Sequence, residues 1–408
     1  MRKIAIVLAF LIWTACKTRN VRTETTETTD SLKSGTFGYD LEFLKKYTSV
    51  VVLSDAAGKS KVAVIGDFQG RIMTSTSGGD EGTGYGWINY DLIKSKEKKP
   101  HINPVGGEDR LWMGPEGGQY SIFFKKGSTF DFANWTTPAL IDTEPFDLVS
   151  SDSSRAVFRT SGKLVNHHGF EFQVEINRTI SLLSKLEIQK EFGIDVAPLQ
   201  SVGFKSENSV TNKGSGRWAK AEGLLSIWIL GMFNPSAQTV IVLPHRPSGD
   251  PGDITDNYFG AIPADRIKQT DLALFLKGDG KFRGKVGISP RAANNIVGSY
   301  DAGRRVLTLV KFDVSAHEDY VNSKWEFQKE PYRGDAVNSY NDGPLADGSQ
   351  LGPFYELESS SPARELKPGE SMTHRHLTVH LEGTTESLDA AAKKALGISL
   401  SDIANAFH

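Results

Sequence analysis

The stretch from 170 to 182 alternates apolar and polar residues with a period of two, and this pattern constrains the fold more than any other feature. Its first apolar positions are Phe170, Phe172, Val174 and Ile176, and the polar positions between them are Glu171, Gln173, Glu175 and Asn177. Successive side chains of a strand point to opposite faces, so the pattern predicts a strand with one face on a core and one in solvent.

Comparable short runs recur along most of the chain, separated by clusters of Gly, Pro, Asn and Asp. They cover residues 50–53, 61–66, 119–125, 154–164, 185–194, 225–233, 239–243, 272–276, 285–288, 306–312, 352–358 and 372–381. Many short strands joined by glycine-rich turns are typical of sandwiches and barrels. We therefore predict an all-β fold, a large antiparallel β-sandwich.

Helices are expected only near the two ends of the body. Residues 41–47 could form one, and 386–396 form a clearer case, with Asp389 four residues before Lys393 and Gly397 at the C-terminal end. Ser399 followed by Asp402 resembles a capping box that opens a last short helix. We expect one large domain over 37–383 and a short helical C-terminal appendage over 384–408.

The N-terminus is typical of an export signal. Arg2 and Lys3 precede an apolar run over 4–13, which is shorter than the about 20 residues that span a bilayer but suits a signal peptide. Small residues then precede Cys16, as in bacterial lipoproteins, where this cysteine carries lipid. We expect a lipoprotein signal over 1–15, with a plain secretory signal as the alternative, and a membrane-anchored protein of the cell envelope, periplasmic or on the outer-membrane surface.

Residues 16–36 are rich in Thr, Glu and Lys and hold few apolar residues, so we predict that they form a disordered tether.

Composition excludes several classes of function. With 47 basic and 49 acidic residues, the chain lacks the positive charge of a strongly basic nucleic-acid binder. One cysteine excludes a disulfide framework and a four-cysteine zinc site. HExxH, Walker and GxSxG motifs do not occur, so we expect no nucleotide cofactor.

Two glutamates near the C-terminus are candidates for catalysis. Glu356 and Glu358 lie two residues apart in a predicted strand and would share one face, with Tyr355 and Leu357 on the other. Two neighbouring carboxyl groups raise each other's pKa, so one can act as a general base. The alternative is a solvent-facing strand on which both are inert.

The segment from 356 to 370 resembles the end of the galactose-mutarotase-like, or aldose 1-epimerase-like, superfamily. In that family a Leu-Glu-Thr strand precedes a Leu-x-Pro-Gly turn, and this chain has Leu357-Glu358-Ser359 and then Leu366-Lys367-Pro368-Gly369. The family's glutamate is its catalytic base. The resemblance therefore implies a β-supersandwich, a carbohydrate ligand, and Glu358 as the base, with Glu356 as the alternate.

Earlier segments carry the same resemblance. Residues 67–75 are similar to an early strand of the superfamily, and 210–214 to its mid-chain Thr-Asn strand end. Residues 106–112 are similar to a loop with a sugar-binding arginine, which implies that Arg110 donates to sugar hydroxyls. As a whole, the chain looks most like a group of Bacteroidetes lipoproteins in this superfamily.

The chain departs from the family at its two histidines. Val105 stands before Gly106-Gly107 where the first would be, and Lys213 follows Thr211-Asn212 where the second would be. His245 is the central histidine left to replace the general acid. Glu116, within a glycine-rich stretch, is another candidate acid, or else a plain turn residue.

Aromatic and amide groups suggest where a sugar would be bound. Trp112 and Trp325 are candidate platforms for the apolar face of a sugar ring, and Tyr340, Asn341 and Asp342 form a polar–aromatic cluster that suits its hydroxyls. The same Asn-Asp-Gly sequence is also ordinary turn chemistry.

We expect no metal. His374, His376 and His380 share one face of a predicted strand and include a His-x-His spacing known from metal sites, but no further ligand is evident nearby. Asp250, Asp253 and Asp256 could hold Ca²⁺, although their spacing of three does not match an EF-hand.

Three functions remain open from the sequence. The first is a sugar epimerase-like isomerase, or related general acid–base chemistry on a sugar or oligosaccharide, with Glu358 or Glu356 as base and Glu116 or His245 as acid. The second is a non-catalytic surface glycan-binding lipoprotein. The third is a structural envelope protein. A fold alone does not decide among them.

Overall fold

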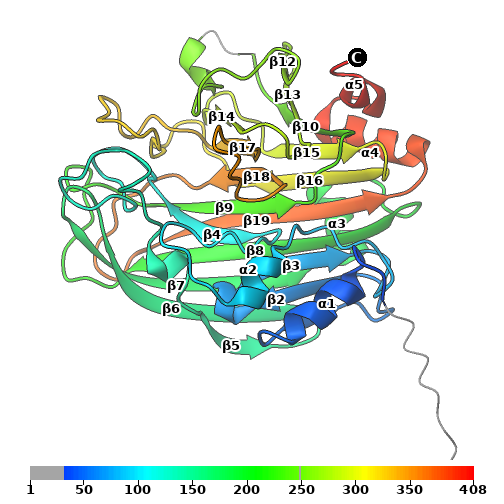
Figure 1. Cartoon of the computed structure of the whole chain (residues 1–408), viewed down its shortest axis with the longest axis horizontal. Coiled ribbons are helices and arrows are strands. Elements are labelled where there is room, and N and C mark those ends of the chain that lie inside the picture. Colours follow the sequence, from blue (N-terminus) through cyan, green and yellow to red (C-terminus); the bar gives the residue numbers. More distant parts are fainter. Residues whose placement is uncertain (1–31, 248–249) are drawn as a thin grey trace, which may run out of the picture. The chain divides into compact units, whose positions relative to one another are not determined.

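The computed structural model describes residues 32–247 and 250–408, most of which belong to one compact unit, Lys33–His408. Figure 1 shows this unit as stacked strands with helices at its margins. The predicted signal segment, the lipidation site Cys16 and most of the predicted tether lie outside the described residues. Within the described ranges, none of the helices is both long and apolar enough to cross a membrane.

The larger sheet has ten strands, all antiparallel to their neighbours. In spatial order they are β12 (Ile267–Gln269), β13 (Ala273–Lys277), β10 (Thr239–Pro244), β15 (Ile296–Asp301), β16 (Val306–Phe312), β19 (Ser371–Glu382), β8 (Gln200–Asn212), β7 (Glu171–Leu182), β6 (Arg155–Val165) and β5 (Asp147–Ser151). The strand β5 lies at one edge, where a bulge between Leu148 and Ser150 interrupts its pairing with β6.

The second sheet has six strands, also antiparallel. They are β11 (Ile254–Thr255), β14 (Gly284–Ile288), β17 (Val337–Asn341), β18 (Tyr355–Ser360), β9 (Ser226–Phe233) and β4 (Arg110–Gly114). A third sheet is made of β1 (Val51–Ser54), β2 (Lys61–Ile65) and β3 (Arg71–Thr76). Its outer side packs on α1 (Phe37–Lys45) and α2 (Tyr90–Ser95) through Leu44, Met73 and Leu92.

The core lies between the two large sheets. Phe172, Val174 and Ile176 of β7 pack in one cluster with Ile227 and Ile229 of β9. In a second cluster, side chains of β10 and β13 pack against Val286, Val337 and Leu357 of the smaller sheet. They come into contact because every second side chain of a strand points inward. The predicted alternation of 170–182 is confirmed, and so is the all-β class.

Three helices cover part of the outer face of the ten-stranded sheet. They are α3 (Lys185–Phe192), α4 (Thr385–Leu396) and α5 (Leu400–Ala404). Ile188, Leu388 and Ile403 pack there on strand residues that include Leu307 and Val379. The predicted C-terminal helices are confirmed, including the N-terminal cap at Ser399, whose Oγ accepts a hydrogen bond from Asp402 N–H at 3.1 Å. Short 3₁₀ turns cover Gly66–Phe68, Ala139–Ile141 and Pro251–Asp253.

Two predicted strands are wrong. Residues 185–194 form the helix α3, because Ser184 and Glu187 make a capping box and Gly193 ends the helix with a φ of 69°. Residues 119–125 form turns, in which Phe123 and Phe124 are buried among other aromatic rings. The first helix also begins earlier than expected, at Phe37, because Thr36 caps it.

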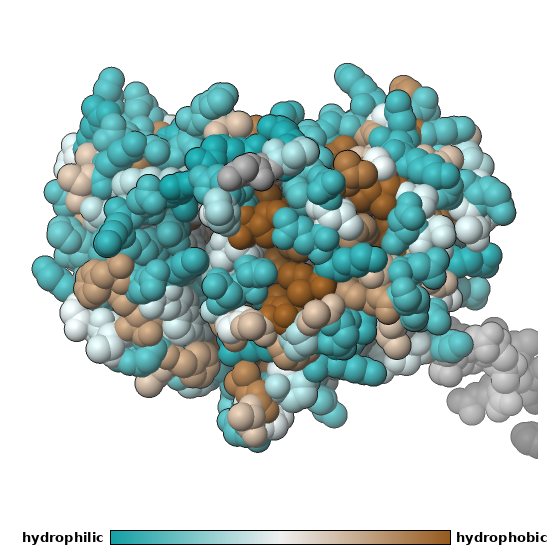
Figure 2. Space-filling model, turned by 90° about the horizontal axis from the view of Figure 1, so that it is seen from above, coloured by the Kyte–Doolittle hydropathy of each residue, from teal (hydrophilic) through white to brown (hydrophobic). Residues whose placement is uncertain are grey.

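The surface seen from above is coloured by hydropathy in Figure 2. Hydrophilic residues dominate this side, and apolar residues are visible in hollows between them. A hollow lies between β13 and α5, where Leu272, Phe275 and Ile398 are among the lining residues.

Candidate active site

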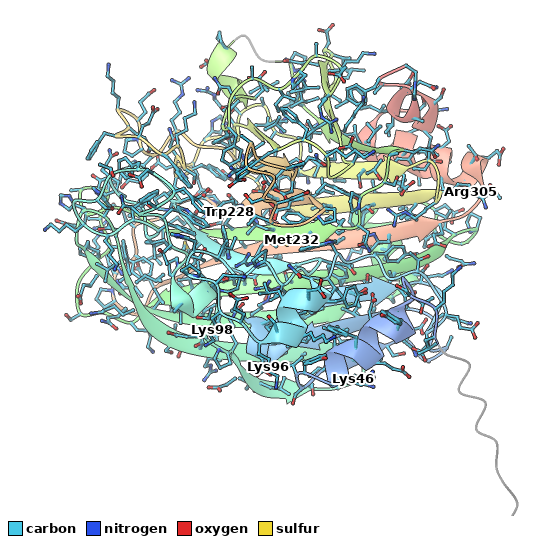
Figure 3. All side chains as sticks on the ribbon, in the orientation of Figure 1. Lys46, Lys96, Lys98, Trp228, Met232 and Arg305 are labelled. Carbon is cyan, nitrogen blue, oxygen red and sulfur yellow. The ribbon has the colours of Figure 1, made fainter. Side chains whose placement is uncertain are left out.

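The candidate site lies on the face of the six-stranded sheet that points away from the core. On β18, Tyr355 and Leu357 enter the core, so Glu356 and Glu358 point the other way, as predicted from their spacing. Glu356 pairs across the sheet with Met232 on β9, and Glu358 with Leu230. Figure 3 marks Met232 and Trp228 on β9, near the middle of the molecule.

A cleft of about 640 Å³, open mouth included, covers this face. The sheet supplies its floor from β4, β9, β14, β17 and β18, and loops supply its walls. The residues that line it are Ile102, Arg110, Trp112, Glu116, Phe132, Trp135, Trp228, Leu230, Met232, Phe259, Arg283, Lys285, Trp325, Tyr340, Leu351, Phe354 and Glu356. Six of these are sequence-predicted candidates: Arg110, Trp112, Glu116, Trp325, Tyr340 and Glu356.

The two carboxyl groups of β18 have different surroundings. Glu356 lines the cleft and is 6% exposed, whereas Glu358 is 0% exposed. One oxygen of Glu358 accepts a hydrogen bond from Trp228 Nε1 at 2.9 Å and lies 3.4 Å from Lys285 Nζ. Burial raises the pKa of Glu356 well above its usual range, and the neighbouring charge of Glu358 raises it further. The raised pKa therefore favours the protonated form of Glu356.

Glu116 approaches the same cleft from the loop after β4. Its backbone N–H donates to Ser323 Oγ at 3.2 Å, and its side chain accepts a hydrogen bond from Trp325. Burial raises the pKa of Glu116, while the charge of Lys285 and the hydrogen bond from Trp325 act in the opposite direction. The cleft thus holds two carboxyl groups that come from separate parts of the chain.

Lys285 is the central cation of the site, and sequence reasoning missed its role. It is 7% exposed, and its Nζ lies 4.5 Å from the ring centroid of Trp228. Burial lowers the pKa of Lys285, but the carboxylates around it, led by Glu358 and then Glu116, outweigh burial and raise it. The only sequence signal is a lysine on the outward face of an otherwise apolar strand.

Arg110 holds unused hydrogen-bonding capacity in the cleft. Its Nη2 lies 2.6 Å from Asp142 Oδ1, and its guanidinium stacks 4.2 Å from the ring centroid of Trp112. Among the described residues, Arg110 Nε and Nη1 and the indole nitrogens of Trp112 and Trp135 have no hydrogen-bond partner. Buried polar groups are normally paired, so these donors indicate a place where a ligand or water accepts.

Other predicted residues lie elsewhere. Within the cluster at 340–342, Tyr340 lines the cleft and donates to Asp342, which also accepts from Gly352 N–H at 3.0 Å. Asn341 faces away and binds the loop at 280–282 through its side chain. His245 directly follows β10 of the larger sheet, and its Nδ1 lies 3.0 Å from Arg246 O.

The candidate metal ligands are engaged in other contacts. His374 and His376 are buried between the sheets, where Ser359 Oγ lies 2.7 Å from one and 2.8 Å from the other. His380 Nε2 lies 2.7 Å from Glu108 Oε2. In the acidic loop, Asp250 and Asp253 both form ion pairs with Arg291. Across residues 32–247 and 250–408, no group of three potential metal-ligating side chains is found.

The comparisons with known proteins agree with the fold. The profile of a family described as "Family of unknown function (DUF6786)" matches residues 35–407. The Slr1438 protein of Synechocystis sp. PCC 6803 has a TM-score of 0.50 at 11% identity over 83% of this chain and 96% of its own. No curated protein sequence matches the chain significantly.

Two further solved structures carry names that refer to sugars. An Escherichia coli K12 protein provisionally named an aldose 1-epimerase has a TM-score of 0.50 at 12% identity, over 82% of this chain and 99% of its own. A galactose mutarotase-like protein of Lactobacillus casei ATCC 334 has a TM-score of 0.46 at 11% identity, over 82% of this chain and 100% of its own. The predicted galactose-mutarotase-like fold is confirmed.

Proposed function

This chain belongs to DUF6786, a family of unknown function, and we propose that it is a carbohydrate-active enzyme. The reaction class is general acid–base chemistry on a sugar ring, with epimerisation at the anomeric carbon as the first candidate. Its fold resembles that of aldose 1-epimerase-like proteins, which suggests a sugar-related function.

The observation that carries the proposal is the pair of carboxyl groups, Glu356 and Glu116, that line one cleft beside Lys285. An acid and a base are needed together because ring opening removes a proton from the anomeric hydroxyl and adds one to the ring oxygen. Two carboxyl groups at separate positions supply both roles without histidines at the two family positions, where this chain has Val105 and Lys213.

The surroundings assign the two roles. The pKa of Glu356 is raised well above its usual range by burial and by Glu358, so it is the protonated acid. Burial raises the pKa of Glu116 as well, but the charge of Lys285 and the hydrogen bond from Trp325 act against burial and favour the ionised form, so we assign Glu116 the role of the base. Closure of the ring on the opposite face returns each proton and gives the other anomer.

Glu358 and Lys285 serve as positioning residues. The buried carboxylate of Glu358 holds the ammonium group of Lys285 at 3.4 Å, and that ammonium group faces the cleft carboxyls. Arg110, Trp112 and Trp135 would bind the substrate, because their unpartnered N–H groups can donate to hydroxyls while the rings pack on apolar C–H faces.

The test is NMR exchange spectroscopy of the 37–408 fragment with α-D-glucose, α-D-galactose, D-xylose and L-fucose. Glu356→Gln, which cannot donate an acidic proton, should slow anomer exchange by about 100-fold or more while it leaves sugar binding intact. Glu207→Gln, on an exposed position of β8, is the matched control and should exchange at the wild-type rate.

Unchanged exchange in Glu356→Gln would overturn the assignment of the acid. Binding of sugars without any exchange by the wild-type protein would instead favour the alternative function, a non-catalytic glycan-binding protein. That alternative draws on the same unpartnered donors of the cleft, which bind a ligand whether or not it reacts.

We also propose that Cys16 carries a lipid anchor in the cell envelope. The basic residues Arg2 and Lys3, the apolar run over 4–13 and the small residues before Cys16 support it. In a bacterial host fed an alkyne-tagged fatty acid, the full chain should take up the label and enter the membrane fraction. Cys16→Ser should lose both properties and Lys17→Ala should keep them; a labelled Cys16→Ser protein would refute the anchor.

A further inference from the structure

A second, larger hollow adjoins the candidate site. This groove has a volume of about 1010 Å³, open mouth included, and runs beside α2 and the loop at 99–104. Ile102, Phe132 and Leu351 line both the groove and the cleft, so the two hollows share a wall. A ligand seated on the cleft carboxyls therefore lies next to the groove, on the other side of these three side chains.

A row of aromatic rings runs from the cleft to the groove. Trp325, which donates to Glu116, stacks on Trp135 with ring centroids 5.8 Å apart. Trp135 in turn stacks on Phe132 at 6.0 Å, and Phe132 lies 4.7 Å from the ring of His101 inside the groove. The row thus begins at the catalytic carboxyl group and ends in the open groove.

The exposure of Phe132 marks it as a contact surface. Phe132 is 54% exposed, although burial of a phenyl ring would stabilise the protein. The ring lies where the two hollows meet. The groove lining also holds the amides of Asn89 and Gln350 and the hydroxyl of Ser95. Aromatic faces beside neutral hydrogen-bonding groups suit the alternating C–H and hydroxyl surfaces of a sugar chain.

The groove has mixed charge. Asp91, Glu97 and Lys99 line it together, and Figure 3 shows Lys96 and Lys98 beside α2 on the same side. A groove without one dominant sign has no preference for a highly charged polymer. A neutral chain fits this mixture better than a polyanion.

We propose that the cleft and the groove form one track for a neutral oligosaccharide, with its terminal sugar at Glu356 and the following units over Phe132 and along the groove. This inference rests on the proposed function, because it extends the same site from one sugar to a chain. Its distinct content is the length of the ligand: the best substrate has at least two units, and contacts beyond the first are made at Phe132 and His101.

The test compares ligands of one sugar type but different length. A glycan array of mono- to hexasaccharides identifies the sugar, and calorimetry then measures the monosaccharide and the tetrasaccharide of that series. The wild-type protein should bind the tetrasaccharide at least tenfold more tightly. Phe132→Ala should reduce this ratio about tenfold, and Phe327→Ala should leave it unchanged, because Phe327 is an exposed ring outside both linings.

The outcomes separate the two proposals. Equal affinity for both lengths, or an unchanged ratio in Phe132→Ala, would overturn the extended track and leave the single-sugar function standing. Preferential binding of sulfated or uronic-acid chains would overturn the neutral-chain assignment. An array without any bound glycan would overturn the proposed function itself.

Discussion

Two carboxyl groups on one strand can differ in chemistry when only one of them reaches a cleft. Glu356 and Glu358 are two residues apart and share a face, yet Lys285 and Trp228 bind only Glu358 directly. The charge of Glu358 raises the pKa of Glu356 and so favours the proton on Glu356. At the scale of single residues, the site depends on this asymmetry.

The buried histidines His374 and His376 predict a loss of stability in acid. Burial lowers their pKa values to about 3 and about 4, whereas in the unfolded chain both titrate near 6.5. Between about pH 6.5 and 4 the unfolded chain therefore binds more protons, so the free energy of unfolding falls as the pH falls. Each histidine contributes about 1.4 kcal/mol per pH unit within that window.

Urea unfolding at pH 7, 6 and 5 measures this loss. His376→Gln should show a shallower pH dependence than the wild-type protein, because one titrating group is gone. His168→Gln, at an exposed position, should follow the wild-type slope. Comparing slopes also removes the opposing effect of Asp40, whose pKa burial raises to about 6. Identical slopes for all three proteins would contradict the assignment.

At the scale of elements, the C-terminal helices are part of the core. Leu388 on α4 is 0% exposed and packs against the ten-stranded sheet, so Leu388→Ala should lower the free energy of unfolding by about 2–5 kcal/mol. Leu186→Ala on α3 is the matched control. That leucine is 75% exposed, and its loss should cost less than about 0.5 kcal/mol. Equal costs in chemical denaturation would show that α4 is dispensable.

Patterns of burial explain which elements the sequence predicts. The strand β7 is predicted because its inward side chains are apolar, whereas β8 is not, because Ser206 and Asn208 face inward there. These polar groups are buried as partners of others: Arg178 Nη1 donates to Asn208 Oδ1 at 2.7 Å. The helix α3 is mistaken for a strand because its capping box at Ser184 outweighs a short apolar pattern.

The candidate site, too, can be predicted from the sequence only in part. Spacing within one strand places Glu356 correctly, since two residues on a strand share a face whatever surrounds them. Which of Glu356 and Glu358 reaches the cleft depends on Trp228 and Lys285, which lie far from them in the chain. Trp135 escapes sequence reasoning for the same reason, because its neighbours Phe132 and Trp325 meet it only in the folded molecule.

At the scale of the whole molecule, the two sheets divide the work. The ten-stranded sheet has the core on one face, and helices cover its other face over β10, β13, β15, β16 and β19. The six-stranded sheet shares that core, and its other face carries the cleft. A cleft floor made of paired strands holds its side chains in fixed register, which suits a reaction that needs an acid and a base at set positions.

The bulge in β5 has a consequence for how molecules meet one another. Leu148 and Val149 are about half exposed on this edge strand, which makes it a template on which a second chain could add a strand. The irregular register between Leu148 and Ser150 breaks the even row of backbone donors and acceptors that such an addition needs. The irregular register of β5 therefore disfavours edge-to-edge association of many chains into fibre-like assemblies.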